Sequence, residues 1–172
     1  LHRRQRLRQF ELIPGPRNAR VAVVLEKPIQ SRSHRNATRT TDRRRAAVVN
    51  ITTQQDAAGG CDGVKDGTFG FHTSNGPSPW WQVDLGRAVE IGRIVVYNRT
   101  DGQTAPRTRR LRILISPSGE PSDFVEVYRH DGSVFYGAKE DRPLVVDFGQ
   151  REAVGRVVRL MVPGRCSFAL DE

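Results

Sequence analysis

A loop of Gly, Pro and Ser residues runs directly into both tryptophans of the chain, Trp80 and Trp81, and this stretch constrains the fold most. From Trp81 to Leu85, apolar residues alternate with polar ones, which is the period of a strand with one buried face. Gly86 predicts the end of that strand, and the apolar run 91–97 predicts a second one after a polar connection. The pattern therefore predicts two neighbouring strands of an antiparallel meander.

Short apolar runs of the same kind recur along the rest of the chain, separated by clusters of Gly, Pro, Asn, Asp and Ser. Stretches with a helical period are almost absent, and 172 residues suffice for one domain. Such spacing is typical of an all-β sandwich or barrel. Further strands are predicted at 21–25, 46–53, 110–116 (with Leu111, Ile113 and Ile115 inward), 124–128, 134–136, 144–148, 154–162 and from 168 onward.

Positive charge is concentrated at the N-terminal end of the chain. Residues 1–45 contain 13 Lys and Arg against 3 acidic residues, whereas the remaining 127 residues carry 15 against 16. A nucleic-acid-binding domain needs basic residues clustered on a folded face, so we predict no specific nucleic-acid partner. We interpret 1–17 as a basic lead-in or linker, 18–172 as the domain, and 31–45 as an Arg-rich loop within it.

Two interpretations of this basic segment stay open, a solvated tail and loop or an attraction to polyanions and acidic membranes. No apolar run approaches the length that spans a bilayer, and residues 1–17 lack the features of a signal peptide. Because the chain begins with Leu, we expect a fragment of a longer protein. Sequence motifs of nucleophilic, phosphate-binding or zinc-dependent enzymes are absent, which predicts a protein without catalytic activity.

A His, an Arg and an Asp flank the two central predicted strands. His72 precedes the first strand, and Arg99 and Asp101 follow the second. Neighbouring strands would bring these residues into loops at one end of the sheet, where all-β proteins usually bind ligands. The guanidinium offers a rigid fork of donors to sugar oxygens, a carboxylate can orient that fork, and an imidazole adds a polar contact. The pattern thus favours a carbohydrate site, in which an aromatic ring of Phe69, Phe71, Trp80 or Tyr97 packs against the sugar.

Simpler roles for the same residues stay open. His72 as a turn residue bonded to the backbone is one alternative, and Arg99 with Asp101 as a local ion pair is another. Trp81 is expected in the core, whereas both a core position and a ligand contact stay open for Trp80.

Several separate motifs together resemble the discoidin domain, the coagulation-factor C type, over about Asn18 to Glu172. The resemblance implies a galactose-binding-like jelly-roll β-sandwich of about eight antiparallel strands, with a non-catalytic ligand site in the loops at one end. Members of the family bind glycans, phospholipid surfaces or proteins. The resemblance also favours an extracellular or cell-surface module that is attached to a larger multidomain protein. The motifs are 25–31, 59–67 with its Asp-Gly pairs, Phe71-His72-Thr73, Pro79-Trp80-Trp81-Gln82-Val83-Asp84-Leu85-Gly86, Tyr97-Asn98-Arg99 and Arg156-Val157-Val158-Arg159-Leu160.

A narrower resemblance is to the F-type lectins, which bind fucose through a His, 26 residues, Arg-x-Asp, four residues and another basic residue. His72, Arg99 and Asp101 match this motif, and Arg107 follows after five residues instead of four. The resemblance implies a glycan site formed by His72, Arg99, Asp101 and Arg107, to which we add Trp80 as the aromatic contact.

This chain also departs from the F-type lectins at the adjacent cysteines that follow the Asp, because Gly102 and Gln103 stand there. These two departures from the motif weaken the prediction of fucose as the ligand more than the prediction of glycan binding. The alternative function is a discoidin-type adhesion module in which the Arg-rich loop 32–45 and apolar loop tips engage an anionic membrane surface or a protein.

The resemblance further implies a structural Ca²⁺ ion held by an Asp-Gly turn and a late Glu. Asp62 and Asp66 match the turn and Glu172 matches the Glu, and backbone carbonyls would complete the oxygen shell. An Asp-Gly turn without an ion is the alternative. For Cys61 and Cys166, the two cysteines of the chain, a disulfide and two reduced thiols both stay open.

Overall fold

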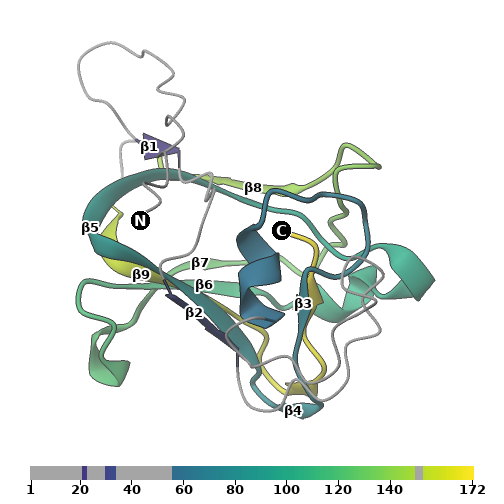
Figure 1. The fold of residues 1–172 in the computed structure, drawn as a ribbon, viewed down its shortest axis with the longest axis horizontal. Coiled ribbons are helices and arrows are strands. Elements are labelled where there is room, and N and C mark those ends of the chain that lie inside the picture. Colours follow the sequence, from purple (N-terminus) through teal and green to yellow (C-terminus); the bar gives the residue numbers. More distant parts are fainter. Residues whose placement is uncertain (1–20, 23–29, 34–55, 150–152) are drawn as a thin grey trace, which may run out of the picture.

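The computed structural model describes residues 21–22, 30–33, 56–149 and 153–172, and Figure 1 shows them as two curled layers of strands. The predicted lead-in 1–17, the strand at 46–53 and residues 34–45 of the predicted Arg-rich loop lie outside these residues. The strands are β1 (Val21–Ala22), β2 (Gln30–Ser33), β3 (Phe71–His72), β4 (Gly76–Pro77), β5 (Trp80–Val96), β6 (Arg112–Ser116), β7 (Val125–Arg129), β8 (Leu144–Asp147), β9 (Val154–Met161), β10 (Arg165–Cys166) and β11 (Ala169–Leu170).

The long strand β5 takes part in both layers. Its first half pairs with β2 and β9, and β9 continues the layer through β6 to β7. Its second half pairs with β8 and, in parallel, with β1. The pairing of β2 also shows that the stretch predicted as a loop from residue 31 begins with strand residues. Because β5 belongs to both layers, it connects the two sheets of the sandwich.

The prediction of two separate strands around Gly86 is wrong, because the single strand β5 continues past this glycine. Gly86 has a φ of 80°, in the left-handed region that favours glycine, and its N–H donates to Asp84 Oδ1 at 2.8 Å. The Asp84 carboxylate also accepts two hydrogen bonds from Arg156 of β9, at 2.9 and 2.8 Å. The glycine therefore bends the strand instead of ending it.

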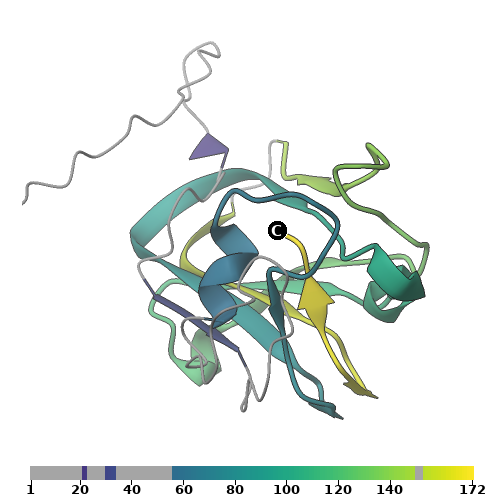
Figure 2. The ribbon, with the colours of Figure 1, turned by 45° about the vertical axis from the view of Figure 1, so that its right-hand side comes forward.

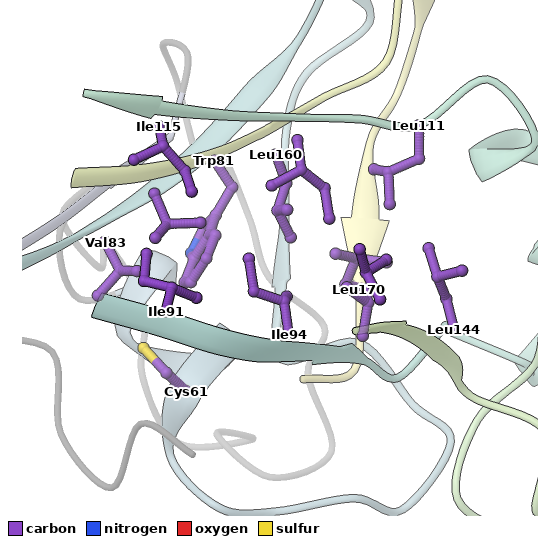
Figure 3. Close-up of a cluster of buried hydrophobic side chains, with 14 of the residues drawn as sticks. Cys61, Trp81, Val83, Ile91, Ile94, Leu111, Ile115, Leu144, Leu160 and Leu170 are labelled. Atoms are coloured by element: carbon purple, nitrogen blue, oxygen red, sulfur yellow. The ribbon is translucent and has the colours of Figure 1, made fainter. Parts of the chain in front are cut away.

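The core lies between the layers, and its pattern confirms the predicted inward residues. Trp81 and Val83 are buried, as are Leu111, Ile113 and Ile115 of the 110–116 stretch. Figure 3 shows Trp81, Leu160 and Ile115 on one side of this cluster and Ile91 and Ile94 of the second half of β5 on the other. Burial of each such side chain stabilises the fold by about 1.5–3 kcal/mol, so one core holds both layers.

No strand forms at 134–136, contrary to the prediction. Phe135 is nevertheless buried, and the Tyr136 N–H and C=O bond to Arg142 and Asn98 in neighbouring loops. The apolar run thus correctly predicts a buried side chain, but its backbone groups form hydrogen bonds with loops and not with a neighbouring strand.

The last strand, β11, links β3 to the end of β5. Ala169 pairs with His72 and Leu170 with Phe71, and Leu170 also forms a bridge with Asn98 just beyond β5. Figures 1 and 2 both show the yellow β11 beside β3. This C-terminal segment therefore brings His72 and the residues after Asn98 to one end of the sandwich. None of the helices in the part of the chain that the structure describes has the length and apolar character needed to cross a membrane.

Candidate functional site

His72 is anchored by Asp56, a carboxylate that sequence reasoning did not single out. Asp56 is fully buried, its Oδ2 accepts a hydrogen bond from the His72 N–H at 3.2 Å, and its Oδ1 lies 3.9 Å from His72 Nδ1. Nδ1 is itself buried, although the side chain is 24% exposed. Nδ1 therefore faces the buried Asp56 carboxylate. The only signal for Asp56 in the sequence is its position at the head of the turn-forming run 56–67.

Arg99 and Asp101 form an ion pair that lies over an aromatic ring. Arg99 Nε donates to Asp101 Oδ1, and Arg99 Nη2 donates to Asp101 Oδ2 at 3.1 Å. The Arg99 guanidinium stacks 4.5 Å from the centre of the Phe69 ring, and His72 packs edge-on against the same ring at 5.1 Å between centres. Phe69 thus joins His72 and Arg99, and the side chains of Arg99 and Asp101 are 21% and 42% exposed.

The loop that carries Arg99 and Asp101 is fixed on two sides. The carbonyl of Gly67 accepts hydrogen bonds from the N–H groups of Thr100 and Asp101 at 3.0 and 3.1 Å. On the inner side, the buried Asn98 amide donates to carbonyl oxygens of Ala105 and Phe135. The arrangement offers guanidinium and imidazole donors beside a carboxylate acceptor in a braced, partly exposed loop, which suits a ligand rich in hydroxyl groups.

The site extends into two short 3-10 helices, η3 (Asp101–Gln103) and η4 (Ala105–Thr108), which accommodate the extra residue before Arg107. Gly102 and Gln103 at the tip both have positive φ angles and are exposed. Arg107 is exposed on η4, and its charge acts on Cys166 of β10. Arg107 therefore lies near β10, and no contact joins it to the group around Phe69 in the part of the chain that the structure describes.

Trp80 lies in a different cluster, on the outer face of β5 opposite to the buried Trp81. The Arg159 guanidinium stacks 4.6 Å from the centre of the Trp80 ring and 3.6 Å from that of Phe124, and it donates to Gln82 Oε1 at 3.0 and 2.7 Å. The structure thus brings His72, Arg99 and Asp101 together around Phe69 and places Trp80 elsewhere.

The predicted metal residues Asp62 and Glu172 meet at a second corner. Glu172 Oε2 accepts a hydrogen bond from the Gly63 N–H at 3.0 Å, and its Oε1 lies 3.9 Å from Lys65 Nζ. Burial raises the pKa of Glu172 to about 7, and the nearby charge of Asp62 adds to this shift. Asp66 instead closes its own turn, because its Oδ1 accepts from the N–H and hydroxyl of Thr68 at 2.9 and 2.6 Å.

Backbone oxygens converge at the same corner. A side chain at Gly70 would come within 2.0 Å of the Gly59 carbonyl oxygen and 2.5 Å of that of Asp171. Among the described residues, no three His, Cys, Asp or Glu side chains gather as a metal cluster. Asp62, Glu172 and the backbone carbonyls are hard oxygen donors of the kind that Ca²⁺ prefers.

Both cysteines are free thiols. Burial raises the pKa of the Cys61 thiol to about 12, with smaller contributions from Glu172 and Asp62. Cys166 lies in β10, near Arg107 and Arg110. The structure thus shows the reduced alternative.

Comparison with known proteins adds independent findings. Residues 38–170 match the model of the F5/8 type C domain. Fucolectin-1 of Anguilla japonica is 40% identical over 63 residues, which are 34% of this chain and 35% of that protein. Fucolectin-5 of the same species is 50% identical over 30 residues, covering 17% of this chain and 16% of that protein. The chain thus spans about a third or less of the length of these relatives.

Solved structures resemble the fold. The lectin domain of lectinolysin, in complex with Lewis B antigen, is 28% identical and superimposes with a TM-score of 0.51 over 67% of this chain and 79% of that one. A Streptococcus pneumoniae fucose binding module is 26% identical, with a TM-score of 0.52 over 67% and 80%. The f-lectin from serum of striped bass, Morone saxatilis, is 21% identical and shares the fold, with a TM-score of 0.65 over 87% of this chain and 46% of that one. From the matched residues and the sandwich itself, we conclude that this chain belongs to the F5/8 type C domain family.

Proposed function

We propose that this chain is a non-catalytic carbohydrate-binding module that recognises glycans through His72, Arg99 and Asp101. The observation that carries this proposal is the group around Phe69, where a partly exposed guanidinium is paired with a carboxylate and stacks on the same aromatic ring that an imidazole contacts. Similarity to fucolectins and to a lectin domain in complex with Lewis B antigen supports it. A fucose-containing glycan is accordingly the first ligand class to test.

Each residue has a defined part in this proposal. Asp101 occupies two N–H groups of Arg99 and so aims the remaining donors at sugar oxygens, while its own oxygens accept from sugar hydroxyls. His72 contributes its imidazole, whose side chain is partly exposed. Phe69 supports both side chains instead of contacting the sugar, since they cover its face and edge. Arg107 flanks the site for a larger glycan, and Trp80 takes no part.

Arg99→Ala tests the site. It should abolish retention on fucose-containing glycans, because loss of hydrogen bonds from a charged donor costs about 1.5–3 kcal/mol and so reduces affinity roughly tenfold or more. The measurement is a glycan array followed by titration calorimetry, with circular dichroism to check the fold. Arg87→Ala, an exposed arginine of β5, is the matched control. Unchanged glycan binding in Arg99→Ala would remove the site assignment.

We also propose that Asp62 and Glu172, with the carbonyl oxygens of Gly59 and Asp171, hold a structural Ca²⁺ ion. Support comes from the Glu172 carboxylate, whose pKa is raised by burial and, to a smaller extent, by the nearby charge of Asp62, and from the carbonyls that converge beside Gly70. The ion would neutralise this charge and fix the turn that is fastened to the glycan-binding loop. Asp66 is left out of this ligand set because Thr68 engages it.

The module is proposed to work within a larger multidomain protein. Support comes from the striped bass f-lectin, because the present chain covers only 46% of that longer chain. Shallow sugar sites bind weakly one at a time, so several linked copies would raise the overall affinity through avidity. The alternative function, binding of an anionic membrane surface or a protein through the Arg-rich loop 32–45 and apolar loop tips, stays a prediction, because residues 34–45 lie outside the described residues.

A further inference from the structure

A pocket of about 190 Å³ lies where the loop end of the sandwich meets the outer face of β6 and β7. Its lining includes four arginines, Arg109, Arg110, Arg112 and Arg129, together with His130 and Asp131. We call it the basic pocket. It shares no lining residue with the group around Phe69.

Positive charge in the basic pocket is only partly compensated. Arg112 and Arg129 are direct partners in the β6–β7 register, an arrangement of like charges that costs stability. Glu126 bridges them, with its carboxylate oxygens 3.2 Å from Arg112 Nη1 and 2.8 Å from Arg129 Nε. The hydrogen bond from Arg129, with a smaller contribution from Arg112, holds the pKa of Glu126 below its usual value.

Arg109 and Arg110 supply the excess charge. Both are exposed, and in the part of the chain that the structure describes neither forms an ion pair. They stand at the end of η4, which begins in the loop of Arg99 and Asp101. Four guanidinium groups thus face two carboxylates, Glu126 and Asp131, and an anion in the pocket would relieve the imbalance.

His130 forms a wall of the pocket and is not free to bind. Its Nε2 lies 3.1 Å from the Ser133 carbonyl oxygen, which can only accept, so Nε2 carries the proton. Nδ1 then accepts from the Tyr128 hydroxyl at 3.0 Å. The side chain is only 5% exposed, and its ring packs edge-on against Phe135. The arginines are therefore the groups that would bind a ligand.

The basic pocket lies at the same end of the molecule as the proposed glycan site. Pro163 of its lining precedes Gly164, whose carbonyl accepts a hydrogen bond from the Ser78 N–H at 2.7 Å. Ser78 belongs to the loop after His72, and β10 pairs with β4 in that loop. A side chain at Gly164 would come within 3.8 Å of Arg110 Nη1. The basic pocket is therefore connected, through Gly164 and Ser78, to the loop that follows His72.

We propose that the basic pocket is a subsite for an oxyanion, a sulfate or carboxylate substituent, carried by the bound glycan. Guanidinium forks match such groups with two parallel hydrogen bonds each. The proposal rests on the proposed function, because the glycan supplies the anion. The large hydrophobic side chains exposed in the described residues are Val64, Val125, Val145 and Val154, and none lines the pocket. A membrane-docking surface would combine basic residues with apolar tips, so a glycan substituent is favoured over a lipid headgroup.

Inorganic sulfate tests the pocket on its own. Titration of the full chain at constant ionic strength, followed by NMR chemical shifts, should show saturable binding that Arg109→Gln/Arg110→Gln weakens at least tenfold. Arg87→Gln/Arg93→Gln removes the same charge from β5 and should leave sulfate binding unchanged. Equal weakening by both double variants, or no saturable binding by the wild type, would overturn the pocket assignment.

Paired glycans test the source of the anion. Fucose-containing oligosaccharides in sulfated or sialylated form should bind roughly tenfold more tightly than their neutral forms, and Arg109→Gln/Arg110→Gln should remove only this difference. Equal affinity for both forms refutes the subsite, as does binding to phosphatidylserine vesicles that the double variant loses while glycan affinities stay unchanged. Absence of any glycan binding refutes the proposed function and the glycan as source of the anion, while the sulfate titration still decides the pocket.

Discussion

Asn98 shows how one buried side chain supports the proposed site without touching a ligand. It is 1% exposed, and its Nδ2 lies 3.1, 2.9 and 2.8 Å from the Ala105 carbonyl, the Thr108 hydroxyl and the Phe135 carbonyl. These contacts tie η4 and the 134–136 run to the residue before Arg99. The amide identity of Asn98 therefore matters, because carbonyl partners need a donor.

Asn98→Asp should destabilise the protein by about 3–5 kcal/mol, since it places a carboxylate against two carbonyl oxygens in a buried position. Urea unfolding measures this loss. Asn75→Asp makes the same chemical change at an exposed loop position and should stay within about 0.5 kcal/mol of the wild type. Equal stabilities of the two variants would contradict the buried donor role of Asn98.

Calcium binding by Glu172 should stabilise the folded protein. Excess Ca²⁺ should raise the melting temperature by several degrees, because an ion that binds only the folded state adds about 2.7 kcal/mol at a hundredfold excess over its Kd. A chelator should reverse the shift, and Glu172→Gln should abolish it. The control Glu120→Gln, at an exposed position, should keep it. A calcium response in Glu172→Gln equal to that of the wild type would exclude this ligand set.

At the scale of elements, the bend of β5 depends on Asp84. Its carboxylate accepts from Gly86 within β5 and from Arg156 in β9, so one side chain fixes both the turn of the strand and its alignment with the neighbouring strand. The hydrogen bonds from Arg156 lower the pKa of Asp84, and that of the Gly86 N–H adds to this. The bend is thus coupled to the charge of Asp84.

Asp84→Asn should cost about 1 kcal/mol near neutral pH, because the Arg156 side chain is partly exposed and the pair is screened. A lowered pKa in the folded state means that the stabilisation is present above the ordinary value of 3.8 and is lost as the pH falls below it. Urea unfolding between pH 2 and 7 should therefore show the two proteins converging at low pH. Asp147→Asn, which breaks the more exposed pair with Arg93, should cost less; a constant difference across the pH range would contradict the coupling.

At the scale of the whole molecule, the proposed site is assembled by the C-terminal segment. β11 pairs with β3 at His72 and bridges to Asn98, so residues near both ends of β5 meet through a third segment. The Tyr97 N–H and C=O also bond to Glu172 and Asp171 at 2.6–3.2 Å. The loop of the proposed glycan site and the proposed calcium corner are therefore held by the same C-terminal segment.

Leu170→Ala should destabilise the protein by about 3 kcal/mol and also weaken glycan binding several-fold, because Leu170 holds β3 and the end of β5 in place. Leu160→Ala in β9 deletes the same buried atoms at a position whose strand partners are Trp81 and Ile113 and not residues of this junction. It should cost similar stability, measured by urea unfolding, and leave calorimetric glycan affinity unchanged. Equal losses of affinity would show that general loosening, not the junction, accounts for the effect.

The sequence by itself determined which residues face the core and where the candidate ligand-binding residues lie along the chain. Alternation placed Trp81 and the 110–116 residues correctly because the side-chain period of a strand is local. The spacing of His72, Arg99 and Asp101 identified residues that the structure does bring together around Phe69. It did not identify Asp56, whose role depends on a neighbour 16 residues away along the chain.

Only the tertiary structure decided which strands pair and how far each one runs. The same glycine can end a strand or bend it. Gly86 bends β5 because its N–H donates to Asp84, whose carboxylate is held by Arg156 of the neighbouring strand β9. Trp80 lies outside the expected site because its side chain is on the outer face of β5, where it stacks with Arg159, which also stacks on Phe124. Alternation specifies a face but not a partner, since the partner is chosen by packing between segments far apart in the chain.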